Sequence, residues 1–99
     1  MINPSDLDPV IHVPARLGVM TALSQHDRCD FKYLKTTLDV SDGNLSTHMT
    51  KLKTVGYIDV KKQFKNNMPH TSYALTTKGR AALSAYLKQL KQLIQVTDL

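Results

Sequence analysis

Residues 41–56 read SDGNLSTHMTKLKTVG, and this pattern predicts a capped amphipathic helix. Ser41 is a favourable N-cap, Asp42 suits the positive end of a helix dipole, and Gly56 supplies a C-terminal stop. We therefore expect a helix from about Asp42 to Val55. Apolar residues recur at helical spacing along its inner face, at Leu45, Met49 and Leu52.

The opposite face of this helix carries short polar side chains, and no acidic residue follows Asp42 on it. Serine, threonine, asparagine and glycine are indifferent helix formers, whereas solvated faces commonly pair acidic and basic side chains four residues apart. Such a face favours a binding role, because short donors and acceptors can approach base edges and phosphates closely. Its residues are Gly43, Asn44, Ser46, Thr47, Thr50, Lys51 and Thr54.

Two helices are expected before this one. Apolar residues recur at helical spacing over residues 10–23, and Pro14 divides them into a lead-in turn and a main helix, since proline is tolerated only in the first helical turn. Apolar positions i, i+3 and i+7 predict a second helix over residues 31–38. Residues 1–8 are polar and contain a proline, so we expect a flexible N-terminus there.

After Gly56 the apolar spacing changes from the period of a helix to that of a strand. Residues 57–64 and 71–75 predict two strands, and residues 65–70 have the composition of the turn between them. The hairpin tip would then carry a lysine, two asparagines and a histidine. The apolar face of the first strand would point inward through Ile58, Val60 and Phe64.

Residues 76–96 predict a long last helix with an apolar stripe about 140° wide. Its later turns should run past so small a body and expose apolar side chains unless a second subunit covers them. This favours a two-fold homodimer through the terminal helices, although the stripe could instead pack on its own core. The residues expected at the dimer interface are Val10, Ile11, Val13, Tyr86, Leu90, Leu93 and Ile94.

The positive charge is concentrated in the second half of the chain. The 99 residues carry a net charge of +5, with four bases and six acids in residues 1–42 but nine bases and two acids in residues 43–99. A nucleic acid is the commonest partner of such a concentration, and a solvated surface is the alternative. The length and the absence of repeats or linkers predict one domain over residues 9–97.

Several classes of protein do not fit the composition. The longest apolar stretch is far below the roughly 18 residues that a membrane span needs, and no leader pattern opens the chain, so we expect a cytoplasmic, nucleoid-associated protein without a membrane partner. Cys29 alone cannot form an intrachain disulfide and is expected to be buried. Asp6, Asp8 and His12 are too loosely spaced for a metal site. No catalytic or cofactor motif is present, so we expect neither an enzyme nor a cofactor.

Three strings in the chain together resemble the winged-helix regulators of the MarR and ArsR superfamily. Residues 38–49 (LDVSDGNLSTHM) are similar to the family's segment joining helix 2 to helix 3, residues 51–58 (KLKTVGYI) to its exit from helix 3, and residues 75–80 (LTTKGR) to the end of its wing. The resemblance covers about residues 9–90 and is nearest to the short single-domain MarR-like members. It implies an α+β, mainly α fold: a winged helix-turn-helix with a three-helix core, a two-stranded β wing and a long C-terminal helix.

The resemblance also implies a transcriptional regulator that binds duplex DNA as a homodimer on an inverted-repeat operator. Helix 3 would lie in the major groove, with the wing on flanking phosphates or in the minor groove. Thr47 and the wing tip depart from the family pattern, because many relatives carry arginine or lysine at the position of Thr47 and an arginine at the wing tip, which predicts contacts dominated by phosphates. The residues implied for DNA contact are Asn44, Ser46, Thr47, Thr50 and Lys51 on the helix and Lys61, Lys62, Lys65, Asn66 and His70 on the wing.

Two other functions fit the same residues. A winged helix used for protein–protein assembly would contact a partner through helix 3 or the wing, although the scarcity of acidic residues there favours an anionic partner. A ligand sensor would instead bind a small molecule between the terminal helices and change the spacing of the two reading helices. The sequence identifies no such effector.

Overall fold

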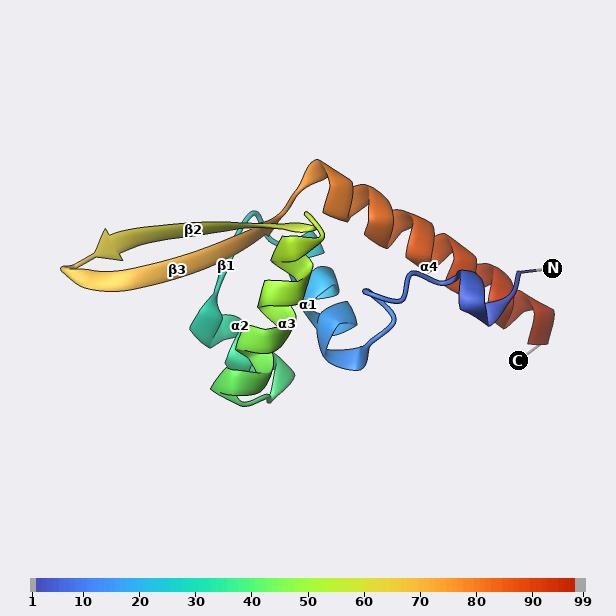
Figure 1. Ribbon diagram of the computed structural model, residues 1–99, viewed down its shortest axis with the longest axis horizontal. Coiled ribbons are helices and arrows are strands. Elements are labelled where there is room, and N and C mark those ends of the chain that lie inside the picture. Colours follow the sequence, from blue (N-terminus) through green and yellow to red (C-terminus); the bar gives the residue numbers. More distant parts are fainter. Residues whose placement is uncertain (1, 98–99) are drawn as a thin grey trace.

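The computed structural model describes residues 2–97, and its fold is α+β and mainly helical, as predicted (Figure 1). Helices α1, α2 and α3 form the body, a hairpin of β2 and β3 forms the wing, and α4 is the long last helix. The elements in chain order are η1 (Pro4–Asp6), α1 (Pro14–Ser24), β1 (Cys29–Asp30), α2 (Phe31–Leu38), α3 (Asp42–Thr54), β2 (Ile58–Lys65), β3 (Met68–Leu75) and α4 (Thr77–Thr97).

The three body helices begin where their capping residues predict. Pro14 occupies the first turn of α1, and Asp30 caps α2 by accepting a hydrogen bond from the Tyr33 amide. The Ser41 hydroxyl accepts the Asn44 amide at 3.1 Å and caps α3. The apolar faces of these helices meet in one core, to which they contribute Val19, Met20, Leu23, Leu34, Leu45, Met49 and Leu52.

A tight connection fixes α3 against α2. Asp39 ends α2 with a φ of 53°, a left-handed conformation that asparagine and aspartate tolerate better than most residues. Lys35 then forms an ion pair with Asp42 across the turn at 2.8 Å. Because both side chains are largely exposed, this pair adds little stability, and the position of α3 depends mainly on its buried apolar face.

The sheet has one more strand than we expected. Its order is β1-β3-β2, fully antiparallel, with Cys29 opposite Tyr73 and Asp30 opposite Ser72. β1 is only two residues long, too short for a periodic pattern, and its partner lies far along the chain. The wing is therefore attached to the body through a strand that precedes α2.

The hairpin turn is shorter than predicted. Asn66 and Asn67 alone connect the strands, with φ values of 54° and 62°. Two consecutive positive φ angles are typical of a two-residue hairpin turn whose twist matches that of the strands, and asparagine tolerates this conformation. The expected turn of residues 65–70 is thus corrected, and His70 lies within β3 opposite Gln63 rather than at the tip.

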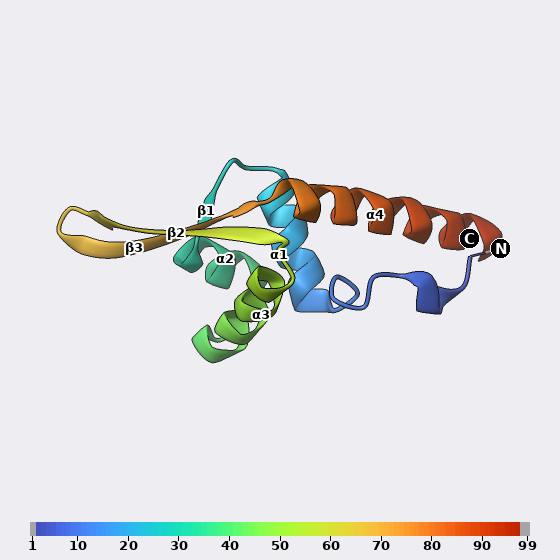
Figure 2. The same ribbon diagram turned by 45° about the horizontal axis from the view of Figure 1, so that its top comes forward.

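The wing and α4 extend in opposite directions from the body (Figures 1 and 2), giving extents of 53 × 26 × 21 Å. The distal half of the hairpin therefore runs past the core. Ile58 is buried as predicted, but Phe64 is 79% exposed and not inward-facing as expected. Its alternation with Ile58 and Val60 is correct, but the body ends before the strand does.

The N-terminal segment lies alongside α4 in both ribbon views (Figures 1 and 2). We expected residues 1–8 to be flexible, but η1 is closed by a capping box between Asn3 and Asp6, and Leu7 is buried in the core. Leu7 is the apolar residue that anchors this segment.

No helix within residues 2–97 combines the length and apolar character that a membrane-spanning segment requires.

Two residues expected at a dimer interface lie inside the protomer. Ile11 is 0% exposed and Tyr86 is 1% exposed, because the N-terminal segment and the first turns of α4 pack together over the core. Neither side chain can lose further solvent contact in a dimer, so both assignments are corrected. On the later turns of α4, Ile94 is exposed as expected, whereas Leu90 and Leu93 are half-buried against the core.

The start of α4 is fixed against the end of α3 at one close contact. The Thr76 hydroxyl donates to the Gly56 carbonyl at 2.6 Å and accepts the Gly79 amide at 2.9 Å, which caps α4. A Cβ atom on Gly79 would lie 2.0 Å from the Tyr57 carbonyl oxygen, so only glycine fits here. The LTTKGR string thus has a structural role at this junction.

Candidate nucleic-acid interface

The outer face of α3 is exposed along its whole length. Leu45, Met49 and Leu52 are buried in the core and fix the rotation of the helix. The opposite side therefore faces solvent, as the spacing predicts. The residues predicted there for DNA contact are all exposed: Asn44, Ser46, Thr47, Thr50 and Lys51.

The threonine hydroxyls on this face bond to the helix itself. Thr47 donates to the Gly43 carbonyl at 3.0 Å, Thr50 to Ser46 at 3.0 Å and Thr54 to Thr50 at 2.8 Å. Each hydroxyl has one hydrogen and uses it in this way, so a ligand meets the oxygen lone pairs and the methyl groups. Such a surface complements amino donors and thymine methyl groups on base edges.

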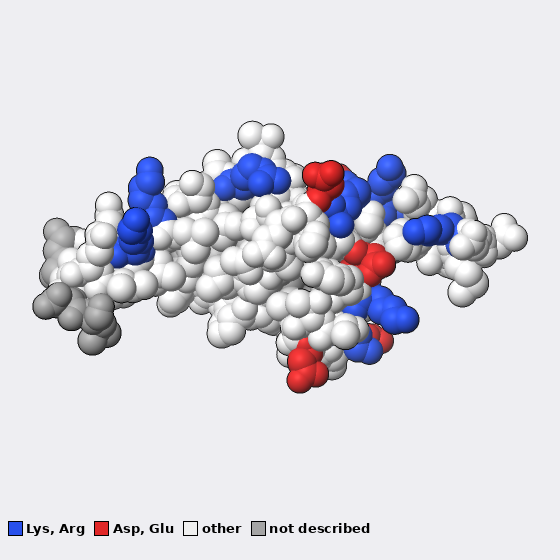
Figure 3. All heavy atoms as spheres, turned by 180° about the vertical axis from the view of Figure 1, so that it is seen from behind, with Lys and Arg blue, Asp and Glu red and all other residues white. Residues whose placement is uncertain are grey.

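The lysines of the wing lie on both faces of β2. Lys61 and Lys65 share one face and Lys62 the other, since side chains alternate along a strand. All three are exposed, and Asn66 lies in the turn at the end of the hairpin. In Figure 3, which shows the molecule from behind, basic side chains follow the hairpin at the right, whereas the middle of that face is mostly uncharged.

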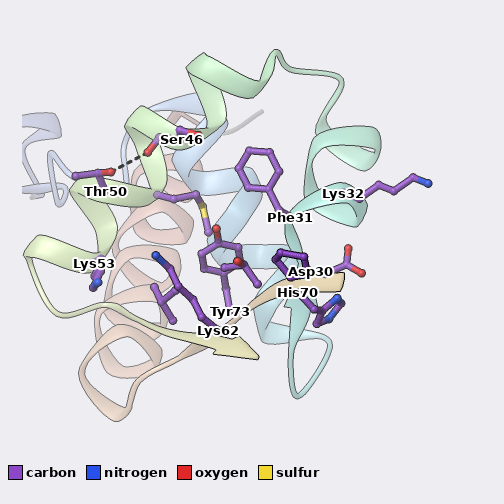
Figure 4. Close-up of a pocket in the computed structure, with 13 residues that line it drawn as sticks. Asp30, Phe31, Lys32, Ser46, Thr50, Lys53, Lys62, His70 and Tyr73 are labelled. Carbon is purple, nitrogen blue, oxygen red and sulfur yellow. Dashed lines mark hydrogen bonds between the residues drawn. The ribbon is translucent and has the colours of Figure 1, made fainter. Parts of the chain in front are cut away.

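A groove of about 680 Å³ separates the wing from α3 and the start of α2 (Figure 4). Phe31 and Tyr73 point into it, while Ser46 and Thr50 line it from α3. The groove thus brings together residues from both predicted contact regions. Its basic side chains are Lys32, Lys53, Lys62 and His70, and the carboxylate of Asp30 also lines it; in Figure 4 Lys32 points outward.

The groove contains two lysines that the sequence did not assign to the interface. Lys53 lies one helical turn after Thr50, and Lys32 lies in the first turn of α2. The position of Lys53 on the helix could have identified it, since i and i+3 side chains are neighbours. Lys32 lines the groove only because α2 folds beside the hairpin, and no local sequence pattern indicates this placement.

Arg28 ties the base of the wing to the body. Its guanidinium donates to the Ser72 hydroxyl at 2.9 Å, to the Ser72 carbonyl at 3.1 Å and to the Asp59 carboxylate at 3.1 Å. These contacts join the segment before β1 to both strands of the hairpin, and they pair the acidic residue of β2 with a cation. The lysines farther along the wing therefore face solvent with little opposing charge.

The polar groups near the N-terminus serve the fold. The Tyr57 hydroxyl donates to Asp8, and this hydrogen bond, with smaller effects of burial and the Asp8 charge, raises the pKa of Tyr57 to about 12. The Nδ1 atom of His12 lies 2.7 Å from the Tyr86 hydroxyl oxygen.

Within residues 2–97, no three histidine, cysteine, aspartate or glutamate side chains come close enough together to hold a metal ion.

Cys29 is buried in the core at the start of β1. Burial, assisted by the neighbouring Asp30 charge, raises the pKa of its thiol. The reactive thiolate form is therefore disfavoured, and the side chain behaves as a small apolar group. This placement agrees with the structural role expected for it.

Comparison with known proteins identifies the family. The winged helix DNA-binding domain family matches residues 15–94. The chain belongs to this family. An uncharacterized protein of Methanocaldococcus jannaschii is 35% identical over 78 residues, which span 79% of this chain and 85% of the relative. A transcriptional regulator homologue from Pyrococcus horikoshii OT3 is 29% identical, with a TM-score of 0.85 over 91% of this chain and 89% of that one.

Further solved structures share the winged-helix fold. The transcriptional repressor CouR, solved bound to a 23-mer DNA duplex, is 25% identical with a TM-score of 0.72, covering 84% of this chain and 58% of its own. A MarR-family regulator from Silicibacter pomeroyi shares the fold at 18% identity and a TM-score of 0.67, over 84% of this chain and 55% of that one.

Proposed function

We propose that this winged-helix protein is a DNA-binding transcriptional regulator that occupies an inverted-repeat operator as a homodimer. In each subunit α3 lies in the major groove, and the wing lies on flanking DNA. Such a protein acts on the chromosome, so we place it at the nucleoid in the cytoplasm. Ten side chains contact the duplex: Asn44, Ser46, Thr47, Thr50, Lys51, Lys61, Lys62, Lys65, Asn66 and His70.

The proposal depends on the continuity of α3, the groove and the wing. The short side chains of α3 let the helix approach base edges, while the groove beside it is lined by Lys53 and Lys62. A DNA strand leaving the major groove would meet these cations and then the wing. His70 would act from the groove wall, since it lies in β3. CouR, which shares this fold at a TM-score of 0.72, was solved bound to a DNA duplex, and this supports duplex binding by this chain.

The C-terminal half of α4 supports the dimer. Leu87 and Ile94, seven residues apart on one face of α4, are 43% and 52% exposed, which is unfavourable for apolar side chains on a helix that extends beyond the body. A two-fold axis beside α4 would cover them. It would also set two copies of α3 about 34 Å apart, one turn of DNA. The remaining interface residues would be Val10, Val13, Leu90, Leu93 and Ile94.

Selection of bound duplexes from random DNA, followed by gel shift, tests this function. We expect enrichment of an inverted repeat with half-sites one helical turn apart, and a shift that high salt abolishes. Enrichment of single half-sites would contradict the dimer but retain the regulator. A chain that binds no duplex even at low salt would contradict DNA binding and favour a winged helix that only assembles with proteins.

A further inference from the structure

The wing tip, which we define as residues 64–69, is apolar as well as narrow. Phe64 is 79% exposed and Met68 is 66% exposed, and Pro69, opposite Phe64, is exposed too. Neither Phe64 nor Met68 packs against the core within the described residues. Large apolar side chains in solvent at the end of a projecting hairpin indicate a surface that a partner covers.

The apolar side chains are distributed over both faces of the tip. Phe64 and Pro69 form a cross-strand pair on one face, and Met68 lies opposite Lys65 on the other. β1 pairs with β3 only at Tyr73 and Ser72, so the hairpin beyond these residues is a free two-stranded ribbon. A ribbon that is apolar on both faces cannot lie flat on one protein surface and satisfy both. It fits a partner that encloses its end.

The charge around the tip identifies the chemistry of this partner. Lys61, Lys62 and Lys65 precede or flank the apolar residues on the same strand, and the acidic residue of β2 is paired with Arg28 at the base. The partner must therefore be anionic at its rim and apolar inside. Duplex DNA has this arrangement, with phosphates along the edges of each groove and the stacked bases between them.

The turn has side chains suited to the minor groove. Asn66 and Asn67 lead the hairpin, and their amides can donate to the N3 and O2 acceptors of A·T pairs. Proteins that enter the minor groove commonly combine such polar contacts with an apolar wedge of phenylalanine, methionine or proline, which partly unstacks a base step and bends the duplex.

We propose that the wing tip is a minor-groove wedge. Asn66 and Asn67 contact base edges, Phe64 inserts beside a base step with Met68 against the opposite wall, and the lysines neutralise phosphates on either side. Such a wedge opens the minor groove and kinks the duplex toward its major groove. This inference rests on the proposed function and adds to it a deformation of the DNA outside the half-sites. Flexible steps such as TA and CA should be preferred there.

Fluorescence and bending measurements test the wedge on the selected duplex. A 2-aminopurine placed at successive flanking positions reports unstacking, and circularly permuted fragments report the bend. With the wild-type protein we expect a rise in fluorescence at one flanking step per half-site and a bend of roughly 20–90°. The Phe64→Ala variant should lose the fluorescence rise, bend the DNA less and bind about tenfold more weakly, with its salt dependence unchanged.

Lys65→Ala is the matched control at the neighbouring position. It should lower the salt dependence while retaining the fluorescence rise. Because Phe64 is exposed, its replacement should leave the unfolding temperature unchanged, which circular dichroism checks.

Duplex binding with no fluorescence rise, or with a rise and bend that Phe64→Ala leaves intact, overturns the wedge but not the regulator. Absence of any duplex binding overturns both. Binding of wild-type protein, but not Phe64→Ala, to phosphatidylglycerol vesicles, with the bend unchanged, would assign the tip to a lipid surface instead.

Discussion

Helices α3 and α4 bury similar apolar faces in one core but expose very different ones. α3 exposes hydroxyl, amide and lysine side chains, whereas α4 exposes Leu87, Ile94 and Val96. The buried faces explain why both segments are helices of this fold. The exposed faces differ because their partners differ in class: α3 suits a polar, anionic duplex, and α4 suits another apolar protein surface.

The largest effect is expected where α4 contacts the segment that follows α3. Gly79→Ala would place a Cβ atom 2.0 Å from the Tyr57 backbone oxygen, so α4 must move away from the end of α3. We expect the free energy of unfolding to fall by roughly 3 kcal/mol, and DNA binding to fall with it. Thermal and denaturant unfolding measure the loss.

Gly43→Ala is the control for this substitution. No atom lies within 4 Å of the position of a Cβ on Gly43, and the residue is already in the first turn of α3. We expect a small gain, about 0.5 kcal/mol, because alanine favours the helix. Equal destabilisation by the two substitutions would contradict the close junction.

The next effect concerns the apolar end of α4. Ile94→Asp introduces a charge where we propose the subunits meet, so sedimentation should show a monomer. Affinity for the inverted repeat should fall on the order of 100-fold, because the two half-sites would be bound independently. Gln92→Asp adds the same charge on the opposite side of the helix and should leave the dimer intact. If both variants dissociate the dimer, the added charge itself causes the dissociation, and the face of α4 that carries Ile94 is not the interface.

A smaller effect distinguishes lysines of the two regions. Lys51→Ala on α3 should weaken binding to every duplex about three- to tenfold and reduce the salt slope by about one. Lys88→Ala, on an exposed position of α4, removes the same charge and should leave binding unchanged. Gel shifts over a salt series provide both quantities. Equal losses in the two variants would indicate attraction by net charge, without an oriented interface.

The smallest effect tests the chemistry of the α3 face. The Thr50 hydroxyl hydrogen is bonded to the Ser46 carbonyl, so its methyl group and lone pairs face outward. Thr50→Val keeps the methyl group and Thr50→Ser keeps the hydroxyl. If the methyl group contacts a thymine, only the serine variant should lose a few-fold in affinity, and deoxyuridine in place of that thymine should remove the difference. Equal loss in both variants would contradict a methyl contact.

The sequence predicted the helices well because their signals are local. Ser41, Asp42 and the apolar spacing through Leu52 define α3 within one residue of its observed end, and Pro14 marks the start of α1. The exposed face of α3 follows from that same periodicity. These features need no knowledge of distant residues, which is why they were recoverable.

The features that the sequence missed depend on tertiary pairing. β1 exists only because Cys29 and Asp30 meet β3. Pro69 and His70 have the composition of a turn, yet they belong to β3. Between the turn and Ser72, β3 pairs only with β2, so its other edge is free. A free edge tolerates proline, which has no backbone N–H to donate. Ile11 is buried because the N-terminal segment packs against α4. The local sequence pattern does not indicate whether Ile11 faces the core of its own subunit or a second subunit.

The most direct test of the central claim is the salt dependence of binding to the selected inverted-repeat duplex. A fluorescence anisotropy titration at several salt concentrations yields the slope of log K against log salt. With the lysines of α3, the groove and the wing on phosphates, we predict a slope steeper than about −4 for the dimer. A slope near zero, or equal affinity for heparin and for the selected duplex at physiological salt, would contradict a surface shaped to bind DNA.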